Sequence, residues 1–236
     1  MLPFTSILGL QPTIPMSFFN PYHKIRTQLT EQSTKILAIL DKSDLHNVGR
    51  LLGILHKGAL VFDEEGTGGT EVSHFSDFAI YDYYNTEGLN CVERYLSKNS
   101  HHLSGMDETL MKARLHAKSS LFSVIGTDPN ISTVLLQDIM NDNHQVKITD
   151  IAMSKSTIIK DCLIFTRILT VDKINLTSGV SIMFTKDKEE LLYKKYKSMI
   201  KQTVAYNNQA KNFIVFLKLN NKYGIHVNHE DIPVYN

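Results

Sequence analysis

The spacing of apolar residues changes twice along the chain. Over residues 22–118 they recur every three or four positions, as in Leu45, Val48 and Leu52, which is the period of an amphipathic helix. Residues 119–185 instead form short β-rich runs, and one of them, "QVKITD", alternates apolar and polar residues. Helical spacing returns after residue 186. We therefore predict an α+β fold with an N-terminal helical region, a small five-stranded antiparallel barrel-like sheet and C-terminal helices.

This change of period divides the chain into four predicted parts. They are an extended arm (1–21), a helical domain (22–118), a small β-barrel-like domain (119–185), and C-terminal helices with a tail (186–236). The predicted strands are 120–126, 132–139, 144–152, 162–171 and 178–185.

Two predicted helices depend on particular end signals. In the helix expected over 41–58, Ser43 or Asp44 can cap the start and Gly58 is a suitable stop. The last helix is expected to end near Gly224, although "FIVFL" within it also fits a strand.

The N-terminal arm is apolar but does not have the pattern of a signal peptide. Pro3, Pro12 and Pro15 interrupt it, and no lysine or arginine occurs before Lys24. Met16 is a plausible second start, so we expect residues 1–15 to be dispensable or to arise from an upstream start. No run of apolar residues reaches the length of about 18 that a membrane span needs.

Composition excludes some classes of function. Hydrophobic residues make up 42% and charged residues 21%, as in ordinary globular proteins, and the net charge is +1. The chain thus has no overall basic charge that would require a nucleic acid or an anionic membrane as partner. Cys91 and Cys162 lie far apart with no metal-like spacing, so we expect reduced thiols and a cytoplasmic location.

A glycine-rich segment, "DEEGTGGTEVSH" (63–74), resembles a phosphate-binding loop only superficially. No lysine follows its glycines, and the three acidic residues before them would repel phosphate. The dinucleotide-binding pattern G-x-G-x-x-G is absent as well. We interpret the segment as a connector between helices and predict no bound cofactor.

Several histidine and carboxylate groups are candidates for metal or catalytic sites. No H-E-x-x-H or G-x-S-x-G motif occurs. We predict no metal site and no catalytic residue, and we interpret Asp77 and Asp82, five positions apart, as solvated caps. The candidate metal groups were His74 with Asp77, His101 with His102, and His226 with His229 and Asp231.

The clearest candidate surface is a lysine-rich helix with interleaved tyrosines. Such a helix can contact the phosphates and bases of a nucleic acid. The alternative is a solvated face, acidic at its start and basic at its end, that suits the helix dipole. The candidate residues are Tyr193, Lys194, Lys195, Tyr196, Lys197 and Lys201.

Five segments resemble a loose family of uncharacterised bacterial proteins. Its members show a "D-[aromatic]-[apolar]-x-[apolar]-D-Y" segment, a "GxxxxERYL" helix and an "aliphatic-x-R-I/L-L" strand, among other features. The resemblance implies a helical part with a small β-barrel and supplies no catalytic residues. Some similar proteins carry a C-terminal SEC-C zinc motif, whose cysteines are missing here. The matching segments are 75–83, 88–96, 120–124, 138–140 and 165–169.

These observations predict a non-enzymatic cytoplasmic interaction module that binds a protein or a nucleic acid and no membrane. One alternative is an enzyme whose acid–base site combines Asp77 and Asp82 with His74 and Arg167; a deep pocket joining them would favour it. Another is a structural homo-oligomer with a large apolar surface on "FIVFL" (213–217).

Overall fold

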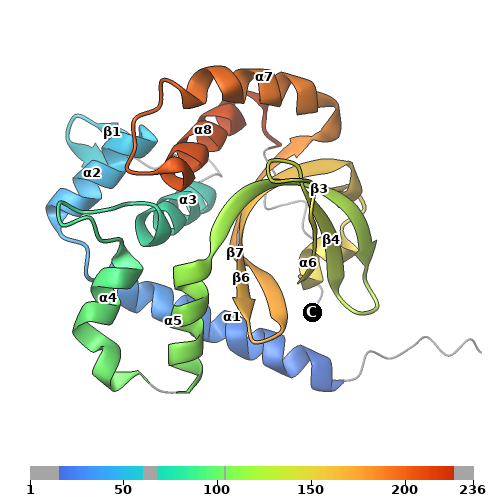
Figure 1. The fold of residues 1–236 in the computed structure, drawn as a ribbon, viewed down its shortest axis with the longest axis horizontal. Helices are drawn as coiled ribbons and strands as arrows, with labels where there is room; N and C mark the ends of the chain where they lie inside the picture. Colours follow the sequence, from blue (N-terminus) through green and yellow to red (C-terminus); the bar gives the residue numbers. More distant parts are fainter. Residues whose placement is uncertain (1–15, 61–67, 104, 226–236) are drawn as a thin grey trace, which may run out of the picture.

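The computed structural model describes residues 16–60, 68–103 and 105–225. Most helices gather on one side of a five-stranded antiparallel sheet, the short helix α6 lies within the curve of the sheet, and α1 runs past its lower end (Figure 1). The α+β prediction is therefore confirmed. The helices are α1 (Met16–Leu37), α2 (Lys42–Leu52), α3 (Gly68–Tyr81), α4 (Cys91–Asn99), α5 (Met106–His116), α6 (Ile151–Lys155), α7 (Glu189–Ile200) and α8 (Asn208–Tyr223). Short 3-10 turns lie at Ser100–His102, Ile159–Asp161 and Lys186–Lys188.

All five predicted strands are present, and they pair in the order β5-β4-β3-β6-β7. Every pairing is antiparallel, so neighbouring strands need only short connections. The strands are β3 (Lys118–Asp128), β4 (Thr133–Asp138), β5 (Gln145–Thr149), β6 (Cys162–Val171) and β7 (Ile174–Thr185).

The sheet is strongly curved but is not a closed barrel, which corrects the barrel-like description. Register shifts in β3 and between β6 and β7 bend the strands, as β-bulges do. The edge strands β5 and β7 approach each other, and the Asn175 Nδ2 group donates a 3.1 Å hydrogen bond to the Lys147 carbonyl. No ladder of backbone hydrogen bonds joins these two edges in the described part of the chain.

The N-terminal helix begins earlier than predicted. Helix α1 starts at Met16, so residues 16–21 are helical and the prediction of an extended arm is wrong for them. Pro21 lies inside this helix, within its first two turns. Residues 1–15 of the predicted arm lie outside the described residues.

Helix α2 begins and ends at other residues than predicted. Asp41 is its cap rather than Ser43 or Asp44, and Gly53 ends it with φ 78°. Beyond Gly53 the chain forms a small hairpin of β1 (Leu55–His56) and β2 (Ala59–Leu60). Lys57 and Gly58 form its turn, both with positive φ, which two-residue hairpins favour.

Helices and sheet share one large apolar core. It includes Leu121, Phe165 and Phe184 from the sheet and Phe213 and Phe216 from α8. The "FIVFL" segment is thus helical, and its residues 213–216 are buried within their own chain. They do not provide the apolar surface that the homo-oligomer hypothesis needs.

The opposite, concave face of the sheet carries a second apolar cluster. Because neighbouring strand residues point to opposite faces, Phe122 and Ile164 face this cluster while Leu121 and Phe165 face the helices. Both faces of β6 are therefore buried, which explains its nearly continuous apolar sequence. Among the described helices, none combines the length and apolar character required to cross a bilayer.

Candidate functional site

Helix α7 is anchored to α8 through one side. Leu192 is buried there, and the Tyr196 hydroxyl donates a 2.8 Å hydrogen bond to Asn212 Oδ1. The Tyr196 ring also stacks on Phe216, with 5.4 Å between ring centroids. Tyr196 thus holds the helix in place, although we had included it in the candidate partner surface.

The other five candidate residues are exposed, and together we call them the α7 basic face. Lys194, Lys197 and Lys201 share one side of the helix because they are spaced by three and four residues. Tyr193 is 60% exposed, and the Lys197 ammonium lies 4.1 Å from its ring centroid. The α7 basic face consists of Tyr193, Lys194, Lys195, Lys197 and Lys201.

Two carboxylates that we expected in solvent are buried against an arginine. Arg167 in β6 donates from Nε to Asp77 at 3.2 Å and from Nη2 to Asp82 at 2.5 Å. Asp77 is 5% exposed, and Asp82 and Arg167 are 2% exposed. The interpretation of the two aspartates as solvated caps is therefore wrong.

The end of α3 explains why both carboxylates reach the same arginine. The backbone N–H groups of Asp82 and Tyr83 both donate to the Phe78 carbonyl at 2.9 Å. This tight turn closes α3 and places the Asp82 side chain against Arg167, which Asp77 already contacts. A spacing of five residues on one straight helix would not give this arrangement.

A second arginine extends this buried cluster towards α1. Arg114 in α5 donates to the Tyr81 hydroxyl at 2.6 Å and to the Leu29 carbonyl at 2.7 Å. Both guanidinium groups lie over the Tyr81 ring, at 5.6 Å for Arg114 and 4.3 Å for Arg167. Two carboxylates and two guanidinium groups therefore balance in charge. The cluster joins three helices to the sheet.

Burial raises the pKa of Asp82 to about 6, and the neighbouring negative charge of Asp77 adds to this effect. The Arg167 guanidinium opposes it. Between pH 6 and the ordinary pKa of 3.8, the folded chain holds a proton on Asp82 that the unfolded chain has released. This group therefore makes the fold more stable as pH falls from 7 towards 4.

We expect Asp82→Asn to remove this contribution. The pKa of Asp82 differs by about two between the folded and the unfolded chain, which corresponds to at most about 3 kcal/mol. The wild type gains this free energy of unfolding when the pH falls. Urea unfolding at pH 7 and pH 5 measures the part gained in this interval, about 1 kcal/mol, with Asp172→Asn on the surface as a control. If wild type and Asp82→Asn have parallel pH profiles, Asp82 does not titrate in this range.

The described histidine candidates form no metal-like group with carboxylates. His74 is buried with its ring edge-on to Phe213, and burial lowers its pKa, an effect that the nearby charge of Asp77 partly opposes. Asp77 itself accepts a hydrogen bond from Arg167. His101 and His102 are exposed in the turn after α4. In residues 16–60, 68–103 and 105–225, no three His, Cys, Asp or Glu side chains gather as metal ligands would.

Two of the site predictions concern residues beyond those described. They are the histidine group at 226–231 and residues 63–67 of the glycine-rich segment. The rest of the glycine-rich segment is helical, because α3 begins at Gly68.

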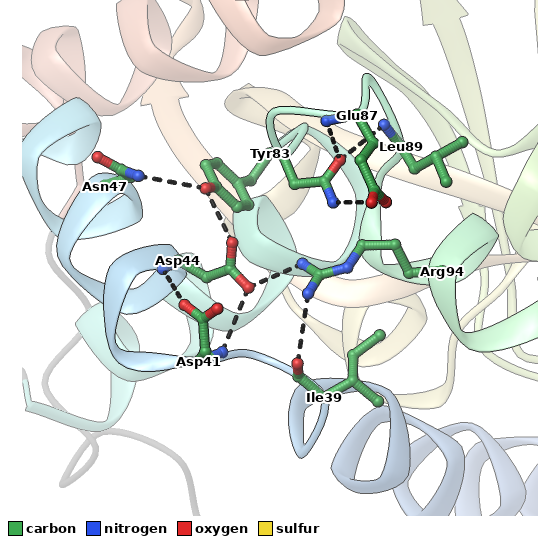
Figure 2. Close-up of polar contacts among 9 residues, drawn as sticks. Ile39, Asp41, Asp44, Asn47, Tyr83, Glu87, Leu89 and Arg94 are labelled. Atoms are coloured by element: carbon green, nitrogen blue, oxygen red, sulfur yellow. Dashed lines mark hydrogen bonds and ion pairs between the residues drawn. The ribbon is translucent and has the colours of Figure 1, made fainter. Parts of the chain in front are cut away.

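A second polar network centres on Asp44 and is shown in Figure 2. Asp44 accepts hydrogen bonds from Arg94 Nη1 at 2.8 Å and from the Tyr83 hydroxyl at 3.0 Å. Asp44 also closes a capping box with Asp41, and Arg94 reaches the Ile39 carbonyl at 3.4 Å. The network ties the starts of α2 and α4 to the ends of α1 and α3.

The same contacts control the ionisation of Asp44. Burial alone would raise the pKa of this carboxyl group, but hydrogen bonds from Arg94, the Asp41 backbone and Tyr83 outweigh that effect. The pKa of Asp44 is therefore below its ordinary value. Asp44 is a charged structural anchor at neutral pH.

The comparisons with known proteins give a family but no activity. Residues 16–230 match a family of unknown function, DUF7986. No curated protein and no solved structure matches the chain. The resemblance to proteins that carry a SEC-C motif stays a prediction. The matched range covers both polar networks and the α7 basic face, and the chain belongs to the family of unknown function DUF7986.

Proposed function

We propose that this protein is a binding module that contacts an anionic partner through the α7 basic face. The observation that carries the proposal is the division of α7 into two sides. Leu192 and Tyr196 fix one side to the core, while four lysines and Tyr193 stay exposed on the rest. A rigid helix that presents several ammonium groups can bind phosphates or carboxylates without first having to fold.

Of the two partner classes, a single-stranded nucleic acid uses more of this surface. Its phosphates pair with the lysines, and its bases can stack on an exposed tyrosine. An acidic protein segment would use only the lysines. Because the net charge of the whole chain is only +1, the attraction for an anionic partner comes from this face. We therefore expect the affinity to weaken steeply as the salt concentration rises.

The convergence of Asp77 and Asp82 is the observation that favours an acid–base enzyme. However, Asp77, Asp82 and Arg167 are buried, and the carboxylates bind the arginine. A shallow pocket between α5 and β6 contains none of these three residues. The burial supports a structural role for the cluster, because a substrate cannot reach the carboxylates without opening the core.

The test removes the charge of three lysines of the α7 basic face. We expect Lys194→Gln, Lys197→Gln and Lys201→Gln together to weaken binding of a labelled single-stranded 12-mer at least about tenfold at low salt. Fluorescence anisotropy with the full chain measures the affinity. A control replaces three exposed lysines on other elements by glutamine, namely Lys98, Lys155 and Lys160, and should keep most of the binding.

Two results would overturn this assignment. Equal losses in both variants would mean that general charge, rather than α7, drives binding. If the wild type binds polyglutamate but not the oligonucleotide, the partner is an acidic protein segment.

A further inference from the structure

The connection between α7 and α8 carries a stacked pair of tyrosines. The ring of Tyr206 lies parallel to that of Tyr84, with 4.1 Å between centroids and an interplanar angle of 9°. Tyr206 is 63% exposed, whereas Tyr84 is half-buried. One face of the Tyr206 ring is therefore covered by Tyr84 and much of the remaining ring is open to solvent.

The pair rests on a rigid support. Tyr84 forms a backbone bridge with Asn90, the residue that caps α4. It directly follows Tyr83, which is hydrogen-bonded to Asp44. The Tyr206 hydroxyl lies over Gly88, where a Cβ atom would be 3.0 Å away, so a side chain at this position would push the tyrosine aside.

We infer that Tyr206, backed by Tyr84, is a stacking platform for a base of a single-stranded nucleic acid. This inference rests on the proposed function, because the phosphates of the same strand would lie along the α7 basic face. Lys201 begins the connection that carries Tyr206, five residues earlier and therefore at most about 18 Å away. Single-strand sites commonly cover about 4 to 16 nucleotides, which is long enough to reach both.

The charges near the platform also suit a base better than a phosphate. Glu87 is exposed in the same turn as Tyr84, and its carboxylate would repel a phosphate. A neutral base stacked on Tyr206 does not meet this repulsion. The surface thus has a basic end that suits the backbone and an aromatic end that suits a base.

The experiment compares a thymidine 12-mer with an abasic 12-mer that has the same phosphates. We expect the wild type to bind the thymidine strand about tenfold more tightly than the abasic strand. Tyr206→Leu should remove most of this preference and leave abasic binding unchanged, whereas Tyr206→Phe should keep it. Urea unfolding of each variant confirms that the fold is intact.

The outcomes separate this inference from the proposed function. If Tyr206→Leu keeps the wild-type preference for the thymidine strand, Tyr206 is not a stacking platform, and the proposal for the α7 basic face is unaffected. The platform is also wrong if the wild type binds both strands equally. If the wild type binds neither strand, both proposals fail together.

Discussion

Replacing Arg167 by methionine is expected to lower the free energy of unfolding by about 5 kcal/mol at pH 7. The substitution leaves Asp77 and Asp82 buried without their common partner. It also removes the guanidinium group from above the Tyr81 ring. Urea unfolding followed by circular dichroism measures the loss, and a variant that does not fold at all agrees with the same expectation.

A compensated variant distinguishes unpaired charge from lost packing. Arg167→Met combined with Asp77→Asn and Asp82→Asn removes all three charges and nearly preserves their volume. We expect it to recover more than half of the lost stability, because no buried carboxylate is left unpaired and Arg114 keeps its hydrogen bonds to the Tyr81 hydroxyl and the Leu29 carbonyl. The structural role assigned to the cluster would be wrong if Arg167→Met alone cost less than about 1 kcal/mol.

Asp44→Ala is expected to cost about 3 to 4 kcal/mol. The variant loses the ion pair with Arg94, the acceptor for the Tyr83 hydroxyl and one half of the capping box. Arg94 then stays largely buried with only its longer contact to the Ile39 carbonyl. The same urea titration at pH 7 measures the effect.

Asp41→Ala is the matched control, because it removes the cap of the same helix but leaves the Asp44–Arg94 pair. A lost cap costs about 1 kcal/mol. We therefore expect Asp44→Ala to be clearly less stable than Asp41→Ala. Equal losses would show that Asp44 contributes as part of the cap and that its pairing with Arg94 adds nothing.

The strands could be predicted from the sequence because their signal is local. In "QVKITD", alternation alone sets which residues face inward, and Ile148 is buried as its position requires. Whether the sheet closes depends on bulges and on how the edge strands meet, which no short segment specifies. The five strands were therefore predicted correctly, whereas the barrel-like description of the sheet was wrong.

The polar clusters could not be predicted because they join distant residues. Arg167 binds carboxylates that lie 90 and 85 positions earlier in the chain. One signal was available: Arg167 interrupts an otherwise apolar strand, and a charge on a buried strand needs a partner. The family-like segments 75–83 and 165–169 contain all three residues, so that pattern marks positions that hold the fold together.

The candidate surface was predictable in position but not in detail. The sequence places the lysines on one helix, but only the packing on α8 shows that Tyr196 faces inward and Tyr193 outward. The Tyr84–Tyr206 stack brings together two loops that are far apart in the sequence. Nothing in the spacing of these two residues indicates that they meet.

The most direct test of the proposed binding function is the salt dependence of oligonucleotide affinity. Anisotropy titrations of a single-stranded 12-mer between 50 and 200 mM salt give the slope of log K against log salt. Four lysine–phosphate contacts predict a slope of about −3, and the Lys194, Lys197 and Lys201 glutamine variant should reduce it to about −1. No binding at low salt, or a slope near zero in the wild type, would contradict the assignment of the α7 basic face as a phosphate-binding surface.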